Sequence, residues 1–191
     1  MSYPEYFDMS KYIAYLVDTL NYDNSISQLL NPAERIKAIL QKYNQILRQR
    51  NQLIKSAVRD RQSFDATIEF WSRQLAHEAA VISKFRLWYS KLADEHVKRF
   101  FLRMTGESEI PEIVYLGSSK QEPDSYLDTD FTEKRYFELL MSAHDREIAQ
   151  GATLFGVHKD DLEINLNGKS ARIYGSQGQQ RSLSITMKLA E

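Results

Sequence analysis

Apolar residues recur at spacings of three and four through the first half of the chain, which is the period of an amphipathic helix. The first run extends over 33–58, with an Asn-Pro start at 31–32 and a spacing close to the heptads of a coiled coil. The second run extends over 66–104 and is followed by Thr-Gly at 105–106, a common helix end. Only the polar stretch at 59–65 separates the two runs. We therefore expect two long helices that pair as an antiparallel arm.

Beyond residue 106 the pattern changes from helical spacing to short alternating runs, which favour strands. In chain order we expect a strand with its exit turn at 112–119, an acidic loop at 120–130, a helix from a capping box of Asp130 and Glu133 to the residue before Gly151, a short strand at 153–156 and a hairpin at 162–174. The hairpin rests on Asn167 and Gly168, because an Asn-Gly pair between alternating runs is the strongest short hairpin signal.

The fold class expected from these patterns is α+β, with the helical arm joined to a partial mixed sheet and a C-terminal helix. The chain then divides into a helical and loop segment at 1–31, the arm at 32–106 and a strand-helix-hairpin segment at 107–191. In the first segment, the apolar residues between Tyr12 and Leu20 have helical spacing.

The charge is distributed unevenly, although the net charge is only −1. Residues 33–103 hold 15 Lys/Arg and 7 Asp/Glu, a balance of +8, whereas the rest of the chain holds 10 and 19, a balance of −9. Such segregation indicates either that the arm meets a polyanion or that it carries a solvated basic surface. Arg48 and Lys55 are seven residues apart and share a helix face. Such a face could bind a phosphate backbone, or it could be a solvated charged surface.

The composition narrows the class of protein. There is no cysteine, hence no disulfide framework and no thiolate chemistry, and the N-terminus lacks a signal-peptide pattern. The longest apolar stretches, such as residues 13–17, are too short to cross a bilayer. We expect a globular cytoplasmic protein without membrane contact.

Two candidate chemistries rest on short stretches near the hairpin. Gly-Lys-Ser within Asn-Gly-Lys-Ser at 167–170 matches the last three residues of the P-loop motif G-x-x-x-x-G-K-[ST]. The motif requires a glycine at position 163, where this chain has Glu163, which argues against a P-loop. His158, Asp160 and Asp161 are residue types that bind metals or transfer protons, so a metal hydrolase is one alternative. The commoner role of such residues in a loop between strands is solvation or ion pairing.

The stretch Gly-Ser-Gln-Gly-Gln-Gln-Arg at 175–181 opens the last expected helix. Ser176 and Gln179 form an S-x-x-Q capping box. Capping of the helix start is therefore a sufficient reason for both residues. The box does not explain Gly178, because glycine in a first helical turn costs up to about 1 kcal/mol relative to alanine. A glycine there suits a helix N-terminus whose backbone is closely approached by a phosphate. We therefore expect one half of a nucleotide-phosphate site.

Two segments resemble the RecF family of bacterial recombination-repair proteins. In residues 146–191, counterparts of the family's G-P-H-R-D-D segment, its Asn-Gly hairpin and its G-S-Q-G-Q-Q-R stretch occur in order. YNQILRQRNQLIK at 43–55 is similar to the family's arm helix. The chain departs from the family at Val157, which replaces proline, and at Lys159, which replaces arginine and loses its bidentate geometry. Gln177, in place of the glycine of most ABC proteins, is usual in RecF.

The resemblance implies the head of an ABC-type ATPase, in which G-S-Q-G-Q-Q-R is the signature motif. In such proteins the signature of one head contacts ATP held by the P-loop of another, so ATP and Mg²⁺ are implied as cofactors of the complete parent protein. The residues implied to contact ATP in trans are Ser176, Gln177, Gly178 and Gln179. For DNA binding, we expect Arg48, Arg50 and Lys55, from the basic stretch of the arm.

By the same resemblance, the parent is a DNA-dependent ATPase that binds double-stranded DNA near gaps, forms an ATP-dependent homodimer and works with mediator proteins to load recombinase. The chain would be an internal piece that starts after the P-loop and stops before the Mg²⁺-binding aspartate, and it would be inactive alone. The alternative from a different class is a helical-hairpin scaffold that binds a protein partner and no nucleotide.

Overall fold

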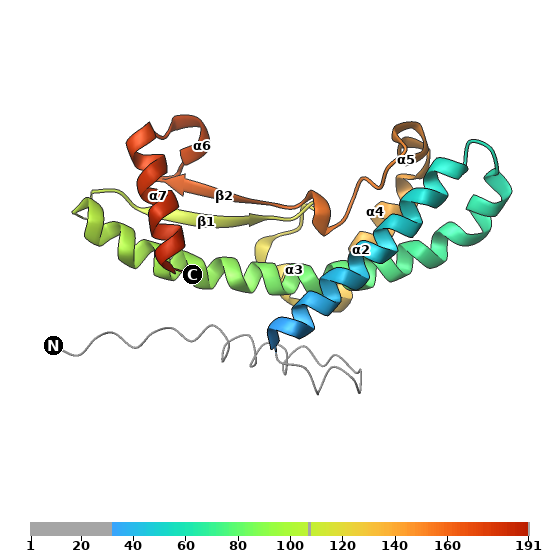
Figure 1. The fold of residues 1–191 in the computed structure, drawn as a ribbon, viewed down its shortest axis with the longest axis horizontal. Coiled ribbons are helices and arrows are strands. Elements are labelled where there is room, and N and C mark those ends of the chain that lie inside the picture. Colours follow the sequence, from blue (N-terminus) through green and yellow to red (C-terminus); the bar gives the residue numbers. More distant parts are fainter. Residues whose placement is uncertain (1–31, 107, 191) are drawn as a thin grey trace.

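The structure, a computed structural model, describes residues 32–106 and 108–190 (Figure 1). Its elements in chain order are α2 (Pro32–Ser56), α3 (Arg61–Thr105), β1 (Pro111–Leu116), η2 (Pro123–Leu127), α4 (Thr129–Ser142), α5 (His144–Gln150), η3 (Val157–Lys159), β2 (Asp161–Leu166), β3 (Lys169–Ser170), α6 (Ala171–Tyr174) and α7 (Gln177–Ala190). The helical spacing expected between Tyr12 and Leu20 and the helix start expected at Asn31 lie outside the described residues.

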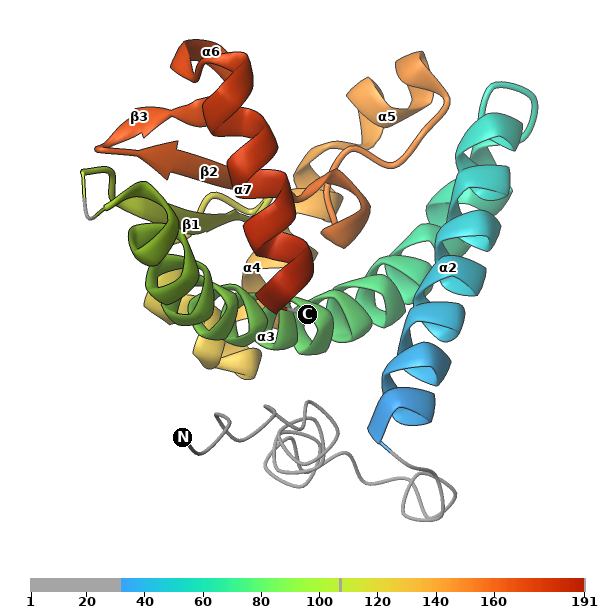
Figure 2. The ribbon, with the colours of Figure 1, turned by 60° about the vertical axis from the view of Figure 1, so that its left-hand side comes forward.

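The expected arm is present, because α2 and the first part of α3 form an antiparallel helical pair (Figure 1, Figure 2). α3 starts at Arg61 rather than at residue 66, since Asp60 caps it by accepting a hydrogen bond from the Ser63 N–H at 2.9 Å. Gly106 ends α3 as expected, in the left-handed conformation with φ of 64°. The helical periodicity therefore predicts both helices well.

The main core lies where α4 packs against α3 beside α2. Its buried members are Tyr43, Ile46, Leu75, Ala76, Ala79, Ile82, Tyr136, Leu140 and Val157. A second cluster, of Ile54, Ala57, Phe64 and Ile68, lies near the turn between α2 and α3. No helix among the described residues has the length and apolarity needed to cross a membrane.

α3 extends along most of the molecule and belongs to both halves of it (Figure 1). Its first part pairs with α2, and its later part contacts β1 and α7. There Phe101 is fully buried with Leu166, Ala171 and Leu183. α3 is thus a continuous link of 45 residues between the arm and the sheet. The segment boundary expected at residue 106 stays a prediction.

In the part of the chain that the structure describes, the sheet has three strands in the order β1-β2-β3, and both pairings are antiparallel. The expected α+β fold is confirmed, but its sheet is antiparallel where we expected a mixed one. The hairpin turn is confirmed, because Asn167 and Gly168 have φ of 49° and 74°, both left-handed as a type I′ turn requires. The returning strand β3 has only two residues, since the chain turns into α6 at Ala171 instead of continuing as a strand to Tyr174.

The helix expected between residues 130 and 150 differs in its start and its continuity. It starts after Asp128, whose carboxylate accepts a hydrogen bond from the Phe131 N–H at 3.0 Å, and not at a capping box of Asp130. It is also interrupted at Ala143, so that α4 and α5 replace one helix. Its end before Gly151 is confirmed, with φ of 67° at that glycine.

Residues 153–156 do not form the expected strand. The Thr153 N–H donates to Asn51 Oδ1 at 2.8 Å, and the Leu154 N–H donates to Glu147 Oε1 at 2.9 Å. These side chains satisfy backbone groups that would otherwise need a neighbouring strand. The segment is therefore an irregular connection that is held by the arm and by α5.

Candidate nucleotide and nucleic-acid sites

Residues 175–179, which we call the signature turn, lead into α7. The Gln179 N–H donates to Ser176 Oγ at 3.3 Å, and the Ser176 N–H donates to Gln179 Oε1 at 2.7 Å. The capping box expected from the sequence is thus confirmed. Ser176, Gln177 and Gly178 are exposed. Because the N–H groups of a first helical turn have no acceptor within the helix, the turn presents backbone donors and a hydroxyl at its surface.

The two glycines of the signature turn have different roles. A Cβ at Gly178 would meet only Ser176 Oγ, at 3.8 Å, so the packing of the chain does not require glycine there. A Cβ at Gly175 would lie 2.4 Å from the Ala171 carbonyl oxygen, which also accepts a hydrogen bond from the Gly175 N–H at 3.1 Å. Gly175 therefore shapes the turn, whereas Gly178 leaves room beside the backbone for a ligand. The sequence pattern singled out Gly178 and missed Gly175.

Gln179 is held from two sides. Its Oε1 accepts from the Ser176 N–H, and its Nε2 donates to Glu109 in the loop that follows α3. Gln179 is half-buried, unlike the three residues before it that we expected to contact ATP. Its side chain is thus engaged within the protein, and its contact with ATP stays a prediction.

Arg50 lies inside the protein, with none of its surface exposed. Its Nη1 and Nη2 donate to the two carboxylate oxygens of Glu147 at 3.0 and 2.7 Å, and Nη1 also donates to Thr153 Oγ1 at 2.8 Å. A phosphate could reach this guanidinium only by breaking a buried ion pair. The expectation that Arg50 contacts DNA is therefore corrected: Arg50 joins α2 to α5. Arg48 and Lys55, by contrast, are exposed on α2.

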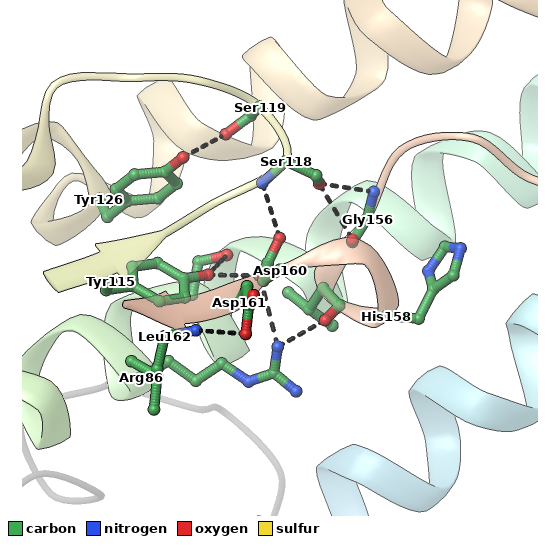
Figure 3. Close-up of polar contacts among 12 residues, drawn as sticks. Arg86, Tyr115, Ser118, Ser119, Tyr126, Gly156, His158, Asp160, Asp161 and Leu162 are labelled. Carbon is green, nitrogen blue, oxygen red and sulfur yellow. Dashed lines mark hydrogen bonds and ion pairs between the residues drawn. The ribbon is translucent and has the colours of Figure 1, made fainter. Parts of the chain in front are cut away.

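Asp160, whose side chain is buried, is the centre of a partly buried polar cluster that joins α3 to the sheet (Figure 3). Its Oδ1 accepts from the Ser118 N–H at 2.7 Å, while its Oδ2 accepts from the Tyr115 hydroxyl and from Arg86 at 3.4 Å. Ser118 Oγ in turn donates to the carbonyl oxygen of Gly156 and accepts from its N–H, each at 3.0 Å. Burial, together with the negative charge of Asp160, raises the pKa of Tyr115, which stays a neutral donor. The sequence indicated only Asp160 among these residues.

His158 and Asp161 point to other partners than Asp160 does, which argues against a shared metal site (Figure 3). One ring nitrogen of His158, Nε2, faces a backbone carbonyl at 3.2 Å and must donate, so Nδ1 accepts from the Tyr43 hydroxyl at 2.7 Å. Burial lowers the pKa of His158 and favours this neutral form. Asp161 accepts from Arg172 at 3.2 Å. Within the described ranges, no three His, Asp or Glu residues are arranged to hold a metal ion.

Comparison with known proteins agrees with the resemblance seen in the sequence, although no family model matches the chain. The chain is 36% identical over 152 residues to the DNA replication and repair protein RecF of Acetivibrio thermocellus, and 37% identical over 152 residues to that of Ruminiclostridium cellulolyticum. Each match covers 80% of this chain and 40% of the relative. The chain therefore spans about two fifths of the length of the curated relatives it matches.

Two solved structures have a similar fold. One is described as the recombination mediator protein RecF-ATPrS in the RecFOR pathway; the TM-score is 0.76 at 24% identity, over 95% of this chain and 45% of that one. The other is described as RecF-ATP in the same pathway and has a TM-score of 0.73 at 24% identity, with the same coverage. The structural similarity shows the fold. Over its matched residues, the chain is similar in sequence to RecF proteins.

Proposed function

We propose that this chain supplies the arm and the signature turn of a DNA-binding ATPase that acts in the cytoplasm in recombinational repair of gapped DNA. The observation that carries the proposal is the signature turn, found in a chain that is similar to RecF proteins. An exposed Ser176 hydroxyl and first-turn N–H groups stand at a helix N-terminus, beside the room left by Gly178. Such a helix end favours phosphate groups.

The proposed ligand of the signature turn is ATP held by a second copy of the protein. Ser176, Gln177 and Gly178 suit a phosphate because they are exposed, carry no negative charge and offer donors. Bound ATP would supply the anionic phosphates that join the two copies into a homodimer. Mg²⁺ is proposed as the ion that accompanies ATP, held by other parts of the complete protein.

The proposed DNA contact is the exposed face of α2 that carries Arg48 and Lys55. The balance of +8 over residues 33–103 supports contact with a phosphate backbone. Recombination mediator proteins are proposed as further partners, because a protein of similar fold is described as part of the RecFOR pathway.

The test is Ser176→Arg in the full-length protein that carries this sequence. We expect the variant to lose ATP-dependent dimerisation, because a long cationic side chain would fill the space beside Gly178. ATP binding by each monomer should be unchanged, since the P-loop of the same copy is not touched. Sedimentation with and without ATP measures the first property, and titration with a fluorescent nucleotide measures the second.

The matched control is Ser142→Arg, at an exposed serine near the end of α4. It adds the same side chain far along the chain from the signature turn and should dimerise normally. If Ser176→Arg still dimerised with ATP, the trans contact would be refuted and the scaffold alternative would be favoured.

A further inference from the structure

Glu109 lies against the signature turn, in the loop that follows α3. It is half-buried, and its carboxylate accepts a hydrogen bond from Gln179 Nε2. The oxygen of the same amide accepts from the Ser176 N–H at 2.7 Å. If that amide flipped, its oxygen would face the Glu109 carboxylate and its NH₂ would face the Ser176 N–H, so both hydrogen bonds would be lost. Glu109 and the Ser176 N–H therefore together determine which way the Gln179 amide points.

The loop that carries Glu109 is itself held in place. The Ile110 N–H donates to Asn167 Oδ1 at 2.9 Å, and the Asn167 N–H donates to the Ile110 carbonyl oxygen at 2.9 Å. Asn167 belongs to the hairpin turn, and Gly106 ends α3 just before the loop. Glu109 is thus presented from a segment anchored to α3 on one side and to the hairpin on the other.

We propose that Glu109 is a positioning residue for the signature turn, a role that rests on the function proposed above for that turn. Glu109 orients Gln179, and Gln179 then holds the backbone of Ser176 so that its hydroxyl and the following N–H groups face the phosphate. Glu109 acts through another residue and does not touch the nucleotide. The shape of the phosphate site consequently depends on the end of α3, the same helix that forms half of the arm.

The first measurement uses the chain itself and needs no nucleotide. In Glu109→Ala, amide hydrogen exchange at Ser176 should become several-fold faster, because Gln179 loses the charge-assisted bond that orients it. The control is Glu112→Ala, which removes an exposed glutamate in β1 whose carboxylate accepts a hydrogen bond from Asn165 Nδ2 at 3.4 Å. Exchange at Ser176 should not change in the control. Equal exchange in both variants would overturn the proposal.

The second measurement exchanges the two partners in the full-length protein. Gln179→Glu alone places two carboxylates against each other and should weaken ATP-dependent dimerisation roughly tenfold. Adding Glu109→Gln restores a donor opposite an acceptor and retains an S-x-x-E capping box, so dimerisation should recover to within about threefold of the parent. ATP binding by the monomer should stay constant throughout.

The outcomes separate this proposal from the function on which it rests. A double variant as weak as Gln179→Glu, with Ser176→Arg unable to dimerise, would overturn the role of Glu109 and leave the trans contact standing. Normal dimerisation of Ser176→Arg would overturn both. Recovery in the double variant supports positioning, because general damage to the fold would not be repaired by a second substitution at the partner.

Discussion

At the scale of single residues, Arg50 shows how far spacing alone can predict the use of a charged side chain. Arg50 lies four residues after Ile46 and four before Ile54, both buried, so its own burial follows from the helical period of α2. Its partner Glu147 could not be predicted, because it is 97 residues away in sequence. Basic composition suggested DNA, whereas position on the apolar stripe of α2 predicts that Arg50 is buried.

The buried pair leads to a prediction about stability. Glu147→Ala should lower the free energy of unfolding by about 3–5 kcal/mol, because Arg50 would be left as an unpaired charge in the interior. Both side chains of this pair are 0% exposed. Asp65→Ala is the control, since it breaks an ion pair with Arg61 whose side chains are 54% and 57% exposed, and it should cost at most about 1 kcal/mol. Urea denaturation measures both, and equal losses would contradict the prediction.

At the scale of elements, the sequence pattern predicted correctly the helices and the hairpin, whose formation depends on neighbouring residues in the chain. The two arm helices follow from apolar spacing, and the hairpin follows from the left-handed conformations that Asn167 and Gly168 adopt readily. The expected strand at 153–156 failed because Asn51 and Glu147, distant in sequence, bind its backbone N–H groups. The sequence of 153–156 alone cannot reveal such acceptors, because they come from distant parts of the chain.

The arm supports a prediction about DNA. The chain should bind duplex DNA weakly and with a steep dependence on salt, because phosphate contacts release counterions. Arg48→Ala with Lys55→Ala should reduce the slope of log affinity against log salt by about two, since each cation releases roughly one counterion. Lys169→Ala, at an exposed lysine in the hairpin, is the control and should leave the slope unchanged. An affinity that is the same at low and moderate salt would reject α2 as a phosphate-binding face.

At the scale of the whole molecule, α3 contacts both α2, which carries the proposed DNA face, and α7, which follows the signature turn (Figure 2). The signature turn was predictable because its capping box and its resemblance to RecF lie in a few consecutive residues. The Asp160 cluster was not, since Arg86 and Tyr115 reach it from separate elements. Sequence therefore predicts sites formed by one segment better than sites formed where several meet.

The trans contact can also be tested with the chain as a separate molecule. The chain has the signature turn but no G-x-x-x-x-G-K-[ST] stretch, so alone it should neither bind nor hydrolyse ATP appreciably. By the proposed function, a full-length Ser176→Arg protein would have the opposite defect, with an intact P-loop and a blocked signature turn. Mixed with ATP, the two should form a one-to-one complex, because the chain supplies the turn that the partner lacks.

Size-exclusion chromatography with light scattering would detect this complex. The same mixture without ATP, and a chain that itself carries Ser176→Arg, should both remain unassociated, since the first lacks the nucleotide and the second lacks an open signature turn. A complex in either control would mean that the two molecules meet through another surface. Apolar side chains such as Ile173 and Tyr174, each 71% exposed beside the signature turn, would then be the first to replace, and the protein-binding scaffold would become the better account.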